Sequence, residues 1–139
     1  MMRRTDQRGF AMLEVMLAIG LFGLVAGGLS VATVGSVRAN DISKQTSAAA
    51  ALVQNTVERF RALNPAVSSA DLTPGYHADP SNPLTPLGAA NGFFTRSWTV
   101  TANTPKIGLS QVAVTVTWQR NATRSVTGVT YVCVTATCG

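Results

Sequence analysis

The chain has 139 residues, of which 46% are hydrophobic and only 12% are charged, and its formal net charge is +5. This length predicts one domain, and so little charge argues against a disordered chain. Outside the first nine residues the basic side chains are thinly spread, so no nucleic acid is predicted as a direct ligand. Two cysteines and one histidine are too few for a Cys/His zinc cluster. We therefore expect no metal and no cofactor.

The longest apolar run lies near the N-terminus. Residues 15–37 contain no charged residue, and a helix of this length, at about 1.5 Å per residue, spans the roughly 30 Å hydrocarbon core of a membrane. Arg3, Arg4 and Arg8 precede the run. This basic flank predicts that the N-terminus is cytoplasmic and that the rest of the chain lies across the membrane.

Two ordinary kinds of apolar N-terminus fit this run poorly. A secretory signal peptide has an apolar run of only about 7–15 residues, followed by a small-residue cleavage site. A plain signal anchor fits the length but leaves Glu14 unexplained, because a carboxylate inside an apolar span costs about 2.5–3.5 kcal/mol on insertion. Glu14 is therefore a candidate functional residue.

Residues 8–24, RGFAMLEVMLAIGLFGL, resemble the N-terminal motif of type IV pilins and type II secretion pseudopilins. In that family a short basic leader ends in Gly, Phe follows, and Glu is the fifth residue of the mature chain. The resemblance implies cleavage by prepilin peptidase between Gly9 and Phe10 and N-methylation of Phe10. Glu14 would then set the assembly register by meeting the amine of Phe10, its own or a neighbour's, because an unpaired buried charge is costly. A snorkelling acid in an ordinary anchor is the alternative.

Glycines recur within the apolar run. Gly23 and Gly27 form a Gly-x-x-x-Gly pair, flanked by Gly20 and Gly28. Small residues at this spacing let membrane helices approach closely. The general abundance of glycine in transmembrane helices explains them equally well.

The helix is expected to continue past the membrane. Six side chains recur at three- and four-residue spacing and predict an apolar stripe that packs against a sheet: Leu52, Val53, Thr56, Val57, Phe60 and Leu63. Pro65 predicts that the helix ends near Leu63 or Asn64.

Residues 64–92 are rich in proline and glycine and are expected to form a long loop, with Leu72 and Tyr76 as its anchors. His77 lies in this segment near Asp71 and Asp79. Because neither a second histidine nor a matching pair of carboxylates accompanies it, we do not expect a metal or acid–base site.

From residue 93 the apolar pattern alternates and predicts three strands, at residues 93–101, 112–119 and 125–135. Residues 119–124 are expected to form a hairpin turn and residues 103–110 a longer connection, which favours an antiparallel sheet. The exposed face of this sheet is expected to be rich in threonine and weakly charged. Asn121, Ala122 and Thr123 match the glycosylation triplet, which we attribute to chance on a turn.

Cys133 and Cys138 follow the membrane segment and would lie in an oxidising compartment. In a straight strand their Cα atoms would be about 16 Å apart, whereas a disulfide needs about 4.4–6.8 Å. A disulfide between them therefore requires residues 135–137 to turn back, and we expect this small C-terminal ring to form. The spacing is not that of a Cys-x-x-Cys redox motif.

These features predict an α+β, pilin-like fold, in which a long N-terminal helix packs on a small antiparallel sheet. The expected organisation is a leader at residues 1–9, a transmembrane and assembly half of the helix at 10–37, a periplasmic half at 38–64, and a head at 65–139. No catalytic residues stand out, and the chain is not expected to be an enzyme.

Within the family, residues 58–65, 96–100 and 112–118 resemble PilV-type minor pilins, and the layout is similar to that of minor pseudopilin I. This implies a minor pilin that primes or modifies assembly of a type IV pilus. The alternatives are a minor pseudopilin of type II secretion and a signal-anchored periplasmic binding domain. The implied partners are major and minor pilins, prepilin peptidase, the assembly platform protein and the inner membrane.

Overall fold

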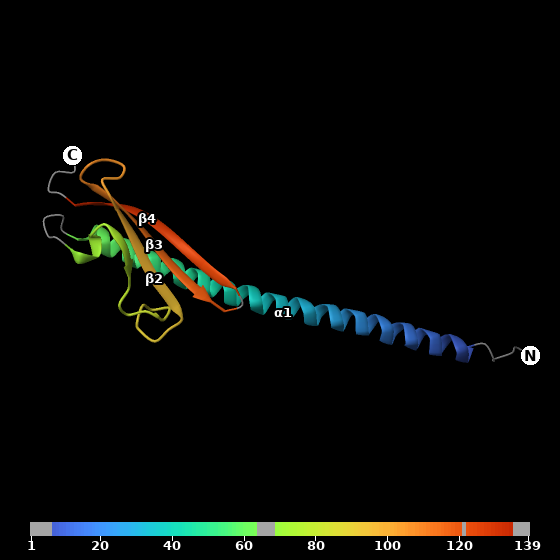
Figure 1. Ribbon diagram of the computed structural model, residues 1–139. Coiled ribbons are helices and arrows are strands. Elements are labelled where there is room, and N and C mark those ends of the chain that lie inside the picture. Colours follow the sequence, from blue (N-terminus) through green and yellow to red (C-terminus); the bar gives the residue numbers. More distant parts are fainter. Residues whose placement is uncertain (1–6, 64–68, 121, 135–139) are drawn as a thin grey trace, which may run out of the picture. The chain divides into compact units, whose positions relative to one another are not determined.

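The computed structural model describes residues 7–63, 69–120 and 122–134, with side chains from residue 11 onward. Its elements are a helix α1 (Gln7–Arg61), a short 3₁₀ helix η1 (Ala70–Leu72), and strands β1 (Gly75–Ala78), β2 (Phe94–Ala102), β3 (Leu109–Gln119) and β4 (Thr123–Cys133) (Figure 1). The chain divides into two compact units, Met1–Ile42 and Ser43–Gly139, and each is described by itself.

The strands form one sheet in the order β1-β2-β3-β4, and every neighbouring pair is antiparallel. A long apolar N-terminal helix with an antiparallel sheet is the α+β, pilin-like architecture that was predicted. The three predicted strands are confirmed as β2, β3 and β4, and the turn between β3 and β4 lies where it was expected.

The prediction of a plain loop over residues 64–92 was wrong for one segment, because β1 lies within it. Gly75 pairs with Val100 and His77 with Trp98 along the outer side of β2. The four residues of β1 carry no alternating apolar pattern, so their extended conformation depends on the edge that β2 offers rather than on their own sequence.

The core of the second unit lies between the last turns of α1 and one face of the sheet. The predicted helix stripe is confirmed, with Leu52 and Phe60 fully buried and Val53 and Thr56 nearly so. The single apolar faces that the alternating pattern predicts for residues 93–101 and 112–119 are confirmed as well. The buried apolar side chains of the sheet are Phe94, Trp98 and Val100 of β2, Val112, Val114, Val116 and Trp118 of β3, and Val132 of β4. Each fully buried large apolar side chain contributes about 1.5–3 kcal/mol to folding.

Helix α1 ends at Arg61, slightly before the predicted end at Leu63 or Asn64. Ala62 still donates its N–H to the carbonyl of Glu58 at 2.9 Å, but Leu63 donates to Phe60 at 3.3 Å, three residues back. This tightening of the last turn is a common way for a helix to end, and it places the boundary ahead of Pro65.

The connection between β1 and β2 is held against the edge of β2. Leu84 donates its N–H to the carbonyl of Phe94 at 2.6 Å and accepts the N–H of Phe94 at 3.0 Å. Leu72 packs against the core, as predicted, but the ring of Tyr76 is 69% exposed, so its predicted anchoring role was wrong. The ring of His77 stacks on Trp98 with 5.6 Å between centroids.

Candidate membrane and assembly segment

The first unit consists of helical residues from Gln7 to Ile42 in its described part. Gly9 and Phe10, the predicted cleavage pair, lie in the first turns of α1, where the structure describes the backbone alone. Their cleavage and the methylation of Phe10 therefore remain predictions.

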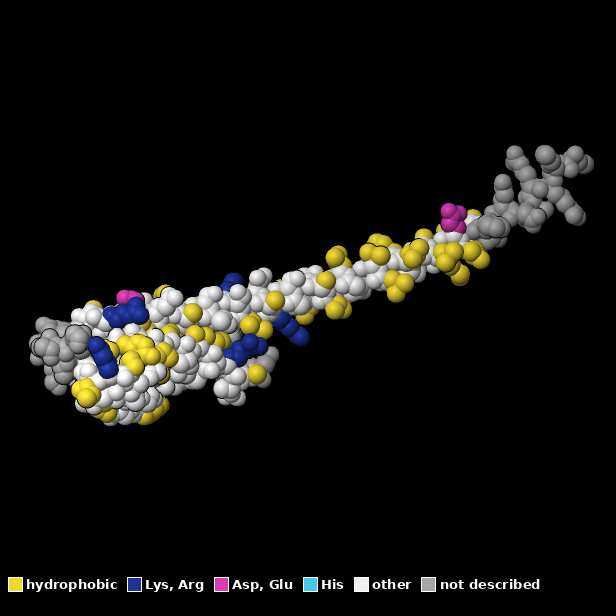
Figure 2. All heavy atoms as spheres, turned by 90° about the horizontal axis from the view of Figure 1, so that it is seen from above, with side chains coloured by type: hydrophobic (Ala, Val, Ile, Leu, Met, Phe, Trp, Pro, Cys, Tyr) yellow, Lys and Arg dark blue, Asp and Glu magenta, His cyan; other side chains and the backbone are white. Residues whose placement is uncertain are grey.

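The surface of α1 between Ala11 and Val37 is apolar on every side. All side chains in this stretch are exposed, among them Met12 at 74%, Phe22 at 75% and Val31 at 75%. Figure 2 shows hydrophobic side chains along this part of the helix. A helix that is apolar all round needs an apolar environment, and within the described chain α1 is long and apolar enough to cross a membrane.

Three hydroxyl side chains interrupt the apolar surface late in this stretch. Ser30, Thr33 and Ser36 donate to the carbonyl oxygens four residues earlier, at 2.9, 2.9 and 3.0 Å. Since no water is present in a hydrocarbon core to accept these hydrogens, the helix must satisfy them itself. The three hydroxyls are thus compatible with a membrane environment.

Glu14 is the exposed charged side chain of this surface, one to two turns from the start of α1. Among the described residues it takes part in no hydrogen bond or ion pair. A carboxylate without a partner in an apolar environment is costly. Its pairing with the amine of Phe10, which exists only after cleavage, stays a prediction.

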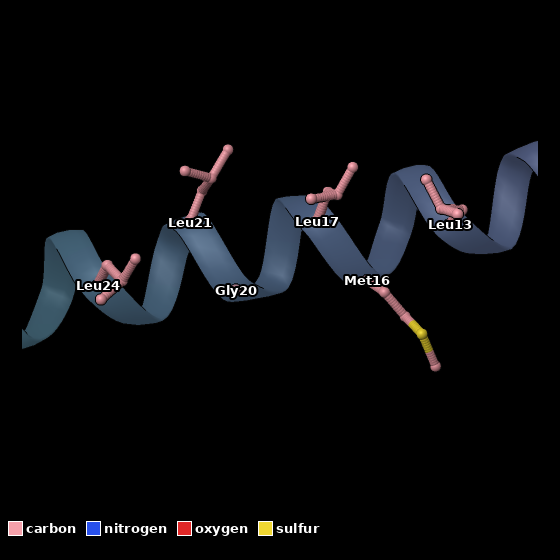
Figure 3. Close-up of a pocket in the computed structure, with 6 residues that line it drawn as sticks. All are labelled: Leu13, Met16, Leu17, Gly20, Leu21 and Leu24. Carbon is pink, nitrogen blue, oxygen red and sulfur yellow. The ribbon is translucent and has the colours of Figure 1, made fainter.

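One face of this part of the helix carries an apolar hollow. The hollow is lined by Leu13, Met16, Leu17, Gly20, Leu21 and Leu24 (Figure 3). In Figure 3 the side chains of Leu13, Leu17 and Leu21 project from successive turns, while Gly20 contributes no side chain. A Cβ atom built on Gly20 would meet nothing within 4 Å, and the same holds for Gly23 and Gly27. No other described group of the unit packs against these three glycines. Close packing at these positions would therefore require a helix from another molecule.

The second unit contains a buried polar centre that the sequence analysis missed. Arg96 of β2 forms an ion pair with Asp79, and their side chains are 13% and 7% exposed. The Arg96 guanidinium also donates to the hydroxyl of Thr56 on α1 at 3.0 Å, and Asn82 bonds both backbone groups of Arg96 at 2.8 Å. The sequence held one indication of this centre, since Arg96 occupies an inward position of the alternating pattern of β2.

The ionised form of Asp79 is stabilised by its neighbours. Burial by itself would raise the pKa of the Asp79 carboxyl, but the N–H of Ser81, the hydrogen bonds from Arg96 and the positive charges of Arg96 and Arg59 together hold that pKa below its ordinary value. The charges are satisfied within the unit, and no buried side-chain nitrogen or oxygen among the described residues lacks a partner. This centre therefore joins α1 to the sheet.

The other side chains that could act in catalysis or metal binding do not cluster in the described part of the chain. His77 donates from Nε2 to the carbonyl of Thr73 at 2.8 Å, and no group of three potential metal ligands occurs in the described part of the chain. Cys133 ends β4, and no described cysteine is free. Cys138 lies outside the described residues, so its disulfide with Cys133 remains a prediction.

Comparison with known proteins gives one match. Residues 4–30 match the family model described as the prokaryotic N-terminal methylation motif. No curated protein and no solved structure matches the chain significantly. The match covers Arg4 and Arg8, the Gly9–Phe10 junction, Glu14 and the hollow at Gly20, and it supports a membrane-anchored protein of the type IV pilin or pseudopilin kind.

Proposed function

We propose that the chain is a pilin-type filament subunit, and more specifically a minor pilin that primes or modifies assembly of a type IV pilus. The observation that carries the proposal is the methylation motif at residues 4–30. From Gln7 onward its residues lie on a helix that, from Ala11, has an exposed apolar surface and one acid, Glu14. A surface of this kind suits a membrane before assembly and a bundle of helices afterwards.

In this proposal the α1 segment holds the subunit in the inner membrane, with its N-terminus cytoplasmic and its head periplasmic. Prepilin peptidase cuts between Gly9 and Phe10, and the new amine of Phe10 is methylated. Glu14 then pairs with such an amine when the subunit joins major and minor pilins at the assembly platform protein. The pair compensates the cost that an isolated carboxylate has among apolar helices.

The same motif supports the alternative of a minor pseudopilin in a type II secretion system. A signal-anchored periplasmic binding domain is the competing function of another class. It accounts for the apolar helix but gives no reason for the junction of Gly9 and Phe10 or for the carboxylate of Glu14.

The experiment is mass spectrometry of the N-terminal peptide of protein extracted from membranes. The expected peptide begins at Phe10 and carries one added methyl group. Gly9→Val should leave the leader in place, because the peptidase must accommodate the chain at a residue without a side chain. Gly28→Val introduces the same side chain farther along the helix and should be cleaved normally. A wild-type protein that begins at Met1 or near Ala39 would refute the proposal.

The choice between a pilus and a secretion filament is tested by immunoblotting of sheared filaments from cells that lack one system or the other. A minor pilin should be found in sheared pili at a small fraction of the main subunit. Recovery only with the secretion filament would favour the pseudopilin alternative. Retention in the membrane under all conditions would favour the anchored binding domain.

A further inference from the structure

Strand β4 lies at one edge of the sheet and pairs along its whole length with β3 (Figure 1). In an antiparallel pair, opposite residues alternate between those that exchange hydrogen bonds and those that do not. Val134 donates its N–H to Gly108 at 3.1 Å, one position beyond the pair of Cys133 and Leu109. The odd-numbered residues of β4 therefore direct their N–H and C=O groups away from β3.

Between residues 125 and 131 this outward row has no backbone partner in the described part of the chain. It includes the backbone groups of Ser125, Thr127, Val129 and Tyr131, for which no hydrogen bond outside the β3 ladder is found. The register from Leu109↔Cys133 to Gln119↔Thr123 is unbroken, so no bulge turns the edge aside. An edge that is long, regular and unpaired is a template for another strand.

At the opposite side of the sheet the edge strand is β1, which together with its connection covers most of the backbone of β2. Leu84 bonds the outward backbone groups of Phe94, while the N–H of Asp79 and the side chain of Asn82 bond those of Arg96. Beyond Arg96, β1 pairs with residues 97–100 of β2. One edge of the sheet is thus a strand of only four residues, whereas the other edge, β4, has 11 residues.

The side chains along β4 fit a strand partner. Proteins usually protect open edges with lysine, proline or short strands. Strand β4 has none of these features, because it has 11 residues and contains no lysine and no proline. Its one charged residue is Arg124, near its start. Val129 and Tyr131 are 49% and 51% exposed on the outer face of the sheet. Every outward-facing residue of the four strands is uncharged. No charge on this face repels an apolar or hydroxyl-bearing strand.

We propose that the open edge of β4 binds an extended, uncharged strand from the head of a different subunit in the same filament, and this rests on the proposed function. Pairing of main-chain groups would supply affinity, and contacts with the exposed side chains of Val129 and Tyr131 would supply specificity. Filament contacts are heterologous, so an edge meets a different surface of its neighbour. A second copy of this chain has no long second edge to offer in such a contact, because the strand at that edge, β1, has only four residues.

The test is residue-resolved amide hydrogen exchange of the full-length chain, measured alone in detergent and in sheared filaments. The amides of Ser125, Thr127, Val129 and Tyr131 should exchange freely in the chain alone and at least about tenfold more slowly in the filament. The amides of Val126 and Gly128 pair with β3 and should be protected in both states. Outward amides that stay unprotected in the filament would overturn the proposal.

Variants separate edge pairing from folding. Thr127→Pro removes an outward donor without touching the β3 ladder, and Val129→Lys places a charge on the edge. Both should reduce the amount of the subunit in filaments at least about tenfold while tryptophan fluorescence stays native. Thr99→Lys puts the same charge on the same face of β2 and should be incorporated normally. Normal incorporation of both edge variants would overturn the proposal.

Two further outcomes are distinct. If the purified wild-type chain is a dimer whose outward amides are already protected, β4 pairs with itself and the different-subunit proposal is wrong. If the wild-type chain enters no filament at all, the proposed function fails, and the edge proposal fails with it.

Discussion

Gly128 of β4 lies directly against Val53 of α1. A Cβ atom built on the glycine would be 2.5 Å from Cγ1 of Val53, a separation that real side chains do not adopt. The helix can therefore approach β4 this closely only because position 128 has no side chain. This contact helps to hold the last turns of α1 on the sheet.

Gly128→Ala should destabilise the head by about 1–3 kcal/mol, the usual cost of overpacking a close contact. Val53→Ala in the same chain should recover part of the loss, because it removes the methyl group that the new side chain meets. Urea unfolding of the full chain in detergent, followed by the fluorescence of Trp98 and Trp118, measures both effects, since both rings are in the core. Strict additivity of the two substitutions would contradict the contact.

Gly92→Ala should be more harmful than Gly128→Ala. A Cβ atom at position 92 would be 1.8 Å from the carbonyl oxygen of Leu84, which is main chain and is itself held by bonds to β2. A side-chain methyl can rotate away, whereas this carbonyl cannot move without breaking the hydrogen bonds that it accepts from Phe93 and Phe94. The same urea titration should place the midpoint of Gly92→Ala below that of Gly128→Ala, and the reverse order would count against the explanation.

Breaking the buried ion pair should also be costly. Asp79→Asn or Arg96→Met leaves the other charge buried without its partner, which typically costs about 3–5 kcal/mol. Asp71→Asn is the matched control, because the ion pair of Asp71 with Arg59 is solvent-exposed and such pairs contribute about 0–1 kcal/mol. Equal effects at positions 79 and 71 would show that the Arg96 centre is not a main support of the fold.

The stability of the head should fall in acid because of the same carboxyl. The pKa of Asp79 is lowered in the folded state, so its contribution is fully present above the unfolded value of about 3.9 and is lost as pH falls through the lower folded value. Urea midpoints measured from pH 6 down to about pH 2 should decline in wild type below about pH 4. Asp79→Asn should not show this acid-induced loss of stability. An equally steep decline of the urea midpoints in the variant would show that other carboxyl groups cause the loss.

The sequence predicted what periodicity encodes and missed what tertiary contacts impose. The stripe of α1 and the inward faces of β2 and β3 follow from burial at periods of 3.6 and 2, and these were confirmed. By contrast, β1 is extended only because it pairs with the edge of β2. Asp79 contacts Arg96 only because the connection between β1 and β2 follows a path that places them side by side. The Gly9–Phe10 junction and Glu14 were found through a motif, while the hollow at Gly20 became visible only on the folded helix.

The predicted disulfide between Cys133 and Cys138 should be local and of modest effect. A ring this small removes little entropy from the unfolded chain, so its contribution should lie at or below the low end of the usual ~2–4 kcal/mol. Protein purified without reductant should resist alkylation at both thiols, and reduction should shift its melting temperature only slightly. Alkylation of both cysteines in that protein would refute the bond.

The last prediction concerns Glu14 and assembly. In the membrane this carboxylate only raises the cost of insertion, whereas in a bundle of helices it can meet the methylated amine of Phe10. Because removal of one partner leaves a buried charge unpaired at a cost of about 3–5 kcal/mol, Glu14→Ala should enter filaments far less than wild type. Glu14→Asp should be intermediate, since the charge remains but the side chain is shorter. Expression, leader removal and membrane insertion should be unchanged.

Immunoblotting of sheared filaments beside the inner-membrane fraction measures this separation. Val15→Ala is the matched control, because it shortens an exposed neighbour on the same turn without changing charge. If Glu14→Ala enters filaments as well as wild type, the carboxylate has no part in docking. If the variant disappears from the membrane instead, Glu14 acts in anchoring, and the assignment of this residue to assembly is wrong.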